Sequence, residues 1–173
     1  MTLTSLEIHA LLDNMADKIR QQYLTTKPVL IGIHTGGVWV AEAILARLGR
    51  DFIDGELSTL NIAYYRDDFT RIGIHPQITP SHLPYSIEDR PILLIDDVIH
   101  SGRTIRAALN EIFDYGRPAS ICLAVLFERG GRELPIQPDI IGQKLTLSET
   151  QHVKLSHDNL SFRIEIQSVG ANA

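Results

Sequence analysis

Short apolar runs alternate with stretches of helical periodicity through most of this chain. Residues 29–33, 92–95 and 121–127 contain no charged residue, and such runs are typical of strands that are buried on both faces of a sheet. The first two runs are followed by residues 38–48 and 105–112, which carry apolar positions at helical spacing. This alternation predicts an α/β fold with a central parallel sheet, flanking helices and right-handed crossovers.

The N-terminal segment has the pattern of an amphipathic helix. Residues 5–24 place apolar side chains near one stripe, and Thr4 or Ser5 is suited to cap the helix. The predicted stripe consists of Leu6, Leu11, Met15, Ile19 and Tyr23. We therefore expect this helix to pack against the rest of the domain along that stripe.

Three further segments complete the predicted layout. Residues 55–65 alternate apolar and polar positions, which predicts a strand. Residues 69–90 contain three prolines and no period, and a loop of this length in a compact domain is usually functional or disordered. Residues 153–167 predict one or two short strands around a turn at residues 157–159.

Composition narrows the class of protein. The 173 residues suit one domain with a sizeable core, at 44% hydrophobic and 21% charged residues. The single cysteine, Cys122, lies in an apolar run and excludes an internal disulfide framework, which fits a reducing cytoplasm. No apolar segment reaches the length of a membrane span, and the N-terminus lacks the pattern of a signal peptide. The net charge of −5 argues against binding nucleic acid without regard to sequence.

The main candidate site lies at residues 92–104. The apolar run ends in two adjacent carboxylates, Asp96 and Asp97, and a short loop then leads into a predicted helix. Ligands of open α/β sheets bind at the carboxyl ends of strands, and a helix N-terminus favours anions through its open N–H groups and its dipole. Carboxylates beside a phosphate-binding loop suit a sugar phosphate.

A second strand–glycine loop–helix unit lies earlier in the chain. His34, Thr35, Gly36 and Gly37 follow the run at residues 29–33 and precede a helical pattern. The same physics makes this loop a second candidate anion site, although taken alone it is better explained as a plain tight turn. It contains neither Lys nor Arg, so backbone N–H groups, Thr35 and a metal ion would have to balance the charge of an anion.

The stretch 92–104 closely resembles the signature of the type I phosphoribosyltransferases, in which a hydrophobic strand, two acids and a small-residue phosphate loop bind phosphoribosyl diphosphate (PRPP). The resemblance implies one phosphoribosyltransferase domain over residues 1–173. A mobile loop at about residues 66–90 and a hood, made of the N-terminal helix and about residues 128–173, would cover the active site. The PRPP-binding residues would be Asp96, Asp97, Val98, Ile99, His100, Ser101, Gly102, Arg103 and Thr104.

The family also implies roles for the loops. Residues 34–37 resemble the loop that binds the pyrophosphate part of PRPP. Arg66, Arg71 and His75 lie in the mobile loop and are candidates to touch the pyrophosphate on closure, although any of them is also explained as a solvated loop residue. The resemblance further implies Mg²⁺, held through PRPP and indirectly by Asp96 and Asp97, and an assembly of two or more copies.

The segment 128–136, ERGGRELPI, extends the resemblance to one subgroup, the bifunctional pyrimidine-operon regulators that are also uracil phosphoribosyltransferases. In this subgroup the segment helps to line the uracil site, which would involve Arg129, Gly130 and Arg132; a charged turn held by Pro135 is the plainer reading. The implied reaction converts uracil and PRPP to UMP and pyrophosphate. Uracil rests on the resemblance alone, so another base, such as hypoxanthine, stays open.

His100 occupies the position at which purine-specific relatives carry an acid near the base. We therefore expect Asp96, Asp97 and His100 to be the catalytic residues, with His100 contacting or deprotonating the base. The alternative for His100 is a loop histidine that contacts phosphate or solvent.

The subgroup also includes regulators that sense UMP or UTP and bind pyrimidine-operon leader RNA. RNA binding needs a basic surface, whereas the N-terminal helix carries Glu7, Asp13 and Asp17 against Lys18 and Arg20. The sequence therefore favours the enzyme. A nucleotide-sensing regulator that acts through RNA or a protein partner remains the alternative.

Overall fold

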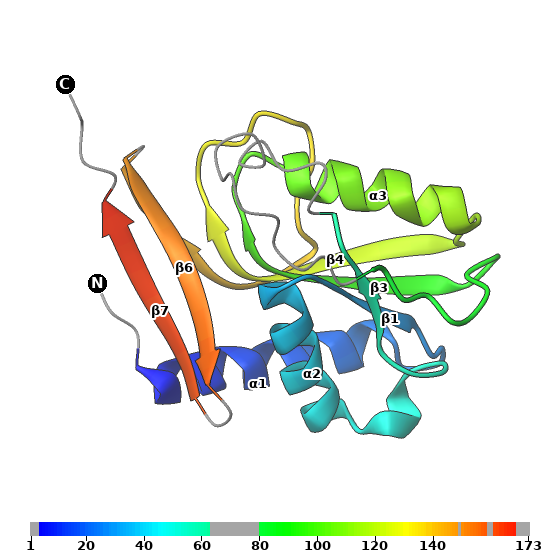
Figure 1. Cartoon of the computed structure of the whole chain (residues 1–173). Coiled ribbons are helices and arrows are strands. Elements are labelled where there is room, and N and C mark those ends of the chain that lie inside the picture. The colour runs from blue at the N-terminus through cyan, green and yellow to red at the C-terminus, as the bar shows by residue number, and fades with distance from the viewer. Residues whose placement is uncertain (1–3, 63–79, 149, 159–160, 169–173) are drawn as a thin grey trace.

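A parallel five-stranded sheet with the order β2-β1-β3-β4-β5 forms the centre of the molecule (Figure 1). The computed structural model describes residues 4–62, 80–148, 150–158 and 161–168. The strands are β1 (Val29–Ile33), β2 (Ser58–Leu60), β3 (Pro91–Ile99), β4 (Ser120–Arg129) and β5 (Ile140–Leu145). The predicted α/β fold with a central parallel sheet is confirmed.

Helices cover both faces of this sheet. α1 (Ser5–Gln22) and α2 (Gly36–Leu48) lie on one face and α3 (Arg103–Tyr115) lies on the other (Figure 1). A short 3₁₀ helix, η1 (Arg50–Phe52), follows α2. None of the helices in the described part of the chain is long and apolar enough to cross a membrane.

The central strand β3 serves two cores at once because successive side chains of a strand point to opposite faces. Leu93 and Ile95 pack with the residues of α1 and α2, whereas Ile92 and Leu94 pack with those of α3. All four side chains are completely buried. The uninterrupted apolar run at residues 92–95 therefore belongs to a strand that is covered on both faces, as predicted.

The buried stripe of α1 is displaced from the predicted one. Ile8 and Leu12 fill the core together with Met15 and Ile19, whereas Leu6 is 80% exposed. The helix starts in a capping box between Thr4 and Glu7. Leu6 lies on nearly the opposite side of the helix from Ile8, at about 100° per residue, and therefore faces solvent. The predictions of the helix, its Thr4 cap and the burial of Met15 and Ile19 are confirmed, and that of Leu6 is wrong.

Two strands differ from their predicted limits, and a third was not predicted. β3 continues through the acids to Ile99, so Asp96 and Asp97 belong to the strand itself. Of the strand predicted at residues 55–65, the described part, residues 55–62, forms a strand only at Ser58–Leu60, because the chain bends before it and Gly55 adopts a φ of +94°. β5 was not predicted, since its sequence, IIGQKL, shows neither a continuous apolar run nor a regular alternation.

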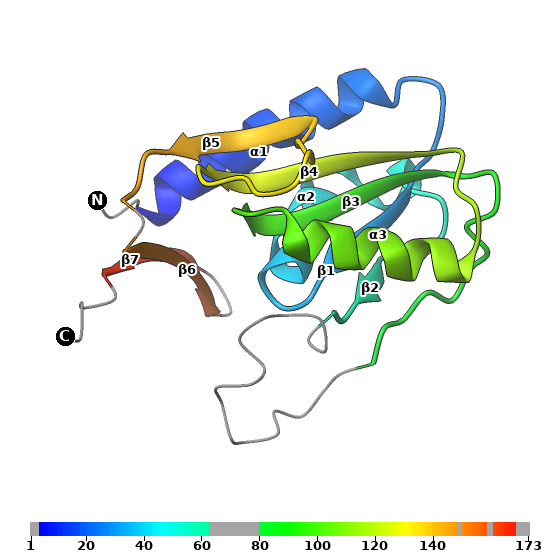
Figure 2. The same cartoon turned by 90° about the horizontal axis from the view of Figure 1, so that it is seen from above.

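The chain ends in an antiparallel hairpin of β6 (Gln151–Asp158) and β7 (Ser161–Ser168), which lies to one side of the main sheet (Figure 2). The prediction of one or two strands in this region is confirmed, with two strands present, but β6 already includes His157 and Asp158, which were expected in the turn. The ring of His157 packs between those of Trp39 and Phe162, with centroid distances of 5.8 Å and 4.6 Å, respectively. Trp39 thus belongs to the packing between α2 and the hairpin.

Only the second part of the predicted loop at residues 66–90 lies within the described residues. His82 forms an isolated bridge with Thr59 beside β2. Ile87 is buried, and Arg90 forms an ion pair with Asp54 at 2.6 Å. Residues 80–90 are therefore anchored to the domain rather than looped out.

Candidate active site

The two acids lie at the carboxyl end of the central strand β3. Asp96 is 4% exposed, and Asp97 is half-buried. The backbone N–H of Asp97 donates a hydrogen bond to Oδ1 of Asp96 at 2.9 Å. The strand is flanked by β1 and β4, so the acids occupy the middle of the sheet edge where ligands of α/β folds bind.

The predicted pyrophosphate loop lies directly against these acids. A Cβ atom placed on Gly36 would lie 2.3 Å from Oδ2 of Asp97, and one on Gly37 would lie 2.7 Å from the carbonyl oxygen of Ile95. Any side chain at either position would therefore collide with the acidic end of β3. The structure thus joins the glycine loop and the acid pair, which are about sixty residues apart in sequence, into one site.

The glycine loop also presents open backbone donors. α2 begins at Gly36, and its N-cap residue, Thr35, makes no side-chain hydrogen bond to the helix. The first N–H groups of a helix have no partner within the helix, so those of α2 are available to an anion. His34 and Thr35 are joined by a cis peptide bond.

His34 is oriented inward from this loop. Its Nε2 atom is buried and has no hydrogen-bond partner among the described residues. Burial lowers the pKa of His34, against a smaller opposite effect of the Glu42 carboxylate. The ring is therefore held towards its neutral form, and the loop offers a polar group rather than a cation.

The predicted phosphate loop connects β3 to α3. Gly102 adopts a φ of +93°, which favours glycine, and α3 begins at the next residue. The Ser101 hydroxyl accepts a hydrogen bond from the N–H of Arg103 at 3.3 Å. Ser101 and Thr104, together with the open N–H groups of α3, can therefore bind a phosphate.

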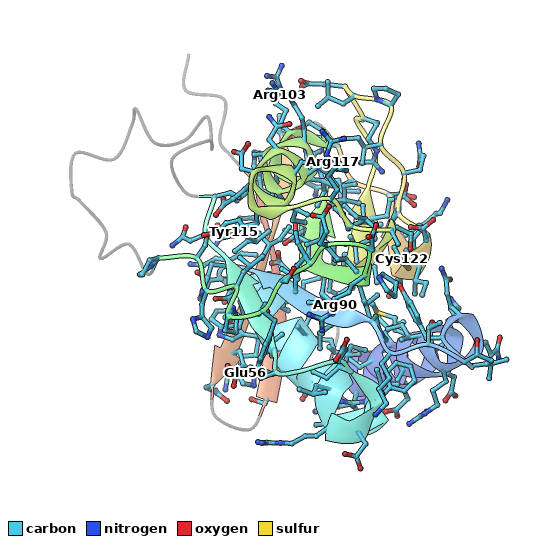
Figure 3. The ribbon with its side chains drawn as sticks, turned by 90° about the vertical axis from the view of Figure 1, so that its right-hand side faces the viewer. Glu56, Arg90, Arg103, Tyr115, Arg117 and Cys122 are labelled. Carbon is cyan, nitrogen blue, oxygen red and sulfur yellow. The ribbon has the colours of Figure 1, made fainter. Side chains whose placement is uncertain are left out.

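Arg103 itself extends outward from the start of α3 (Figure 3). Its side chain is exposed, and its Nε atom lies 2.7 Å from Oε2 of Glu133. The N–H groups of Glu133 and Leu134 both donate to the carbonyl oxygen of Ser101. The segment after β4 thus folds back onto the phosphate loop and holds Arg103 at its outer side.

A cavity of about 280 Å³ lies between the phosphate loop and the C-terminal hairpin. It is lined by Val98, Ile99, His100, Ser101, Gly102, Thr104, Ile105, Arg129, His152 and Val153. Seven of these residues come from the predicted PRPP stretch and the first turns of α3. The cavity therefore lies next in sequence to the acid pair, and β4 and β6 contribute the rest of its lining.

Arg129 and Arg132, two of the predicted nucleobase residues, make different contacts. Arg129 is 5% exposed, lines the cavity and contacts Nδ1 of His152 at 3.3 Å. Arg132 instead forms an ion pair with Glu128 at 2.8 Å and donates to the backbone carbonyl of His100. Arg132 thus links the end of β4 to the backbone of the phosphate loop.

His100 is held by the third predicted nucleobase residue. Its Nδ1 atom lies 2.7 Å from the carbonyl oxygen of Gly130, and a Cβ on Gly131 would lie 2.5 Å from the Cε1 atom of the ring. Gly131 has a φ of +92°, so both space and backbone conformation require glycine there. His100 is thereby fixed within the wall of the cavity.

Sequence reasoning missed His152 and Val153, which line the cavity from β6. A single histidine in an alternating strand carries no chemical signature, and only the position of the hairpin reveals it. The predicted pyrophosphate contacts of the mobile loop, Arg66, Arg71 and His75, lie outside the described residues.

The donor set suits magnesium bound together with a substrate. Among the described residues, no group of three His, Cys, Asp or Glu side chains is arranged to hold a metal ion. Mg²⁺ usually retains several waters and binds through one or two carboxylates and substrate phosphates. The adjacent carboxylates of Asp96 and Asp97 fit a magnesium ion that is bound through carboxylates together with the phosphates of a substrate.

Comparison with known proteins places this geometry in a family. Residues 3–159 match the model of the phosphoribosyl transferase domain. The chain is 58% identical over 165 residues to a protein of Nitrosococcus oceani named Bifunctional protein PyrR, with 93% of each chain covered. It is 53% identical over 148 residues to the protein of the same name from Pseudomonas paraeruginosa, covering 84% of this chain and 85% of the relative.

Solved structures show the same fold at low identity. A hypoxanthine-guanine phosphoribosyltransferase from Bacillus anthracis superposes with a TM-score of 0.68 at 15% identity, over 84% of each chain. A purine phosphoribosyltransferase from Pyrococcus horikoshii gives a TM-score of 0.62 at 24% identity, over 83% of this chain and 85% of the other. The matched domain, the sequence identity and the shared fold agree, and the chain belongs to the phosphoribosyltransferase family.

Proposed function

We propose that this protein transfers the phosphoribosyl group of PRPP to uracil, which yields UMP and pyrophosphate. The observation that carries the proposal is the contact between the glycine loop and the acid pair: two anion-binding helix starts flank two carboxylates at one sheet edge. PRPP has the matching order of groups, with a phosphate at one end, ribose hydroxyls in the middle and pyrophosphate at the other end. The relatives named Bifunctional protein PyrR support uracil as the acceptor base.

Each end of PRPP would be bound by a different loop. Ser101, Thr104 and the first N–H groups of α3 would hold the 5′-phosphate, and the N–H groups at Gly36 and Gly37 would hold the pyrophosphate. The phosphate lies far from the reacting carbon, so its binding energy serves to orient the sugar. The side chain of Arg103 takes no part in this scheme, because it is paired with Glu133.

The acids act on the ribose between these loops. Their carboxylates would accept hydrogen bonds from the ribose hydroxyls and stabilise the positive charge that develops on the sugar as its bond to pyrophosphate breaks. Asp96 and Asp97 would also hold Mg²⁺ through the substrate. When bound, that ion supplies positive charge that offsets the charge of the leaving pyrophosphate.

His100 is the candidate base for the acceptor. A carbonyl oxygen can only accept, so Nδ1 of His100 donates to Gly130, and Nε2 of the neutral ring keeps a lone pair. That lone pair can take the proton from N1 of uracil. Replacement of His100 by Ala should lower kcat by more than about tenfold, or about 1.4 kcal/mol; a smaller loss would exclude an essential base.

The experiment that tests the proposed function is a panel of bases. Pyrophosphate release is measured with PRPP and Mg²⁺ in the presence of uracil, cytosine, hypoxanthine or guanine. The proposal expects release with uracil and none without a base. Release with hypoxanthine alone would replace uracil by a purine, and no release with any base would refute the enzyme.

A second candidate function is regulation of pyrimidine genes in response to UMP or UTP, which the name of the relatives favours. The RNA-binding version lacks support from α1. Lys18 donates to the carbonyl oxygen of Ile141, and Arg20 is paired with Asp17, so both cations are engaged within the protein. A salt-dependent shift of pyrimidine leader RNA in a gel would establish RNA binding, whereas UMP binding without any shift would favour a protein partner.

A further inference from the structure

The cavity beside the phosphate loop contains two histidines from distant parts of the chain. His100 comes from the loop between β3 and α3, and His152 comes from the exposed side of β6 in the C-terminal hairpin. Arg129 lines the same cavity and contacts His152. His152 has no role in the function proposed above, yet it faces the space that the acceptor base would enter.

The contact with Arg129 determines which nitrogen of His152 carries the proton. Nη1 of Arg129 lies 3.3 Å from Nδ1 of His152. Because a guanidinium can only donate, Nδ1 must be the acceptor, and the neutral ring carries its hydrogen on Nε2. Arg129 is buried and also contacts the carbonyl oxygen of Ser148 at 3.5 Å, so the donor that fixes this tautomer is itself held in place.

His100 has the opposite arrangement. Its Nδ1 atom donates to Gly130, which leaves Nε2 as the acceptor of the neutral ring. Neither Nε2 atom has a hydrogen-bond partner among the residues that the structure describes. Both histidines line the cavity, so its lining residues include one unpaired ring acceptor, on His100, and one unpaired ring donor, on His152.

We propose that these two rings together recognise the adjacent N–H and C=O groups of a lactam-type base, with His152 donating from Nε2–H to the carbonyl oxygen. The inference rests on the proposed function and extends it, because it assigns the hairpin a part in base recognition. In uracil the pair would be N1–H and the neighbouring carbonyl at C2. A base lacking a carbonyl beside the reacting N–H would leave the donor of His152 without a partner, which costs affinity.

The same donor would assist the reaction. As the proton of N1 moves to Nε2 of His100, the electron pair left on N1 spreads onto the carbonyl oxygen. N1 then forms the bond to C1′ while the bond from C1′ to the pyrophosphate oxygen breaks, and the leaving group takes that electron pair. A fixed N–H group at the carbonyl oxygen stabilises the negative charge before the new bond forms.

The test compares three variants in steady-state kinetics with PRPP and Mg²⁺. His152→Leu removes the donor and keeps an apolar side chain of similar reach, and His152→Gln retains an N–H donor at the end of the side chain. Lys154→Leu is the matched control, since Lys154 is exposed on the same side of β6 and does not line the cavity. The exposure of His152 means that its replacement leaves the packing of the hairpin intact.

The expected result is an effect on the kinetics of uracil without an effect on the binding of PRPP. His152→Leu should lower kcat/KM for uracil by at least about tenfold and leave KM for PRPP within about twofold, since a hydrogen bond to the base alone is lost. His152→Gln should recover most of the loss, and Lys154→Leu should match the parent protein.

A loss below about threefold in His152→Leu, an equal rise in KM for PRPP, or a glutamine variant no better than the leucine variant would overturn the inference. Failure of the parent protein to release pyrophosphate with any base would instead refute the proposed function. UMP binding, measured by calorimetry, then tests His152 independently. Weaker binding in His152→Leu than in Lys154→Leu would support base recognition, and equal binding would refute it.

Discussion

The most direct consequence of the site geometry concerns Gly36. A Cβ atom there would lie 2.3 Å from Oδ2 and 2.4 Å from Cγ of Asp97, whereas ordinary contacts begin at 3.4 Å. In Gly36→Ala, the carboxylate of Asp97 must therefore move by about 1 Å, a misplacement that can cost about a hundredfold in rate. This loss corresponds to about 2.7 kcal/mol in the activation free energy.

The assay is steady-state pyrophosphate release at saturating PRPP and uracil, accompanied by thermal unfolding. Overpacking also destabilises, by about 1–3 kcal/mol, so kcat is compared at a temperature at which the variant remains folded. Ala46→Ser is the matched control, because Ala46 is exposed on the same helix, away from the acids. A folded Gly36→Ala variant that keeps more than about a third of the parental kcat would refute the claim that loop and acids form one site.

Three further predictions concern stability. Thr4→Ala removes the cap of α1 and should lower the free energy of unfolding by about 1 kcal/mol, measured by urea denaturation; an unchanged midpoint would contradict the capping box. Phe127→Ala should cost about 3–5 kcal/mol, since this side chain is completely buried in β4, and a loss below about 1 kcal/mol would contradict the packing around β4. Burial raises the pKa of the Cys122 thiol from 9.0 to about 11. The contribution of the protonated thiol to the free energy of unfolding is therefore complete below pH 9 and is lost as the pH rises towards 11. The loss of stability at alkaline pH should be smaller in Cys122→Ala than in the parent protein, by roughly 2–3 kcal/mol. Equal pH profiles would contradict this.

The two loops of the site were predictable because each carries its own chemistry. An apolar run that leads into two acids, and an earlier run followed after two residues by two glycines, indicate ligand loops at the same edge of a parallel sheet. What the sequence alone did not reveal is that Gly36 and Gly37 touch the acids. That contact depends on β1 lying beside β3, which is a property of the strand order.

The features that the sequence did not predict correctly also have specific physical causes. Leu6 lies two residues before Ile8, which at about 100° per residue puts it on nearly the opposite side of the helix from the buried stripe, so it faces solvent although Ile8 in the same turn is buried. β5 mixes glycine and polar residues at the edge of the sheet, where one flank needs no partner strand, and so lacks a strand pattern. His152 enters the site only through the packing of the hairpin against α1 and α2, which periodicity does not encode.

The binding of PRPP by Asp96 and Asp97 is the step on which the proposed function depends most. Calorimetric titration of PRPP with Mg²⁺ into the parent protein and into the double variant Asp96→Asn/Asp97→Asn measures this directly, with PRPP consumption in the presence of uracil recorded alongside. We expect the double variant to fold and to lose at least about a hundredfold in PRPP affinity, together with its consumption of PRPP. Unchanged affinity and consumption in the double variant would contradict the account.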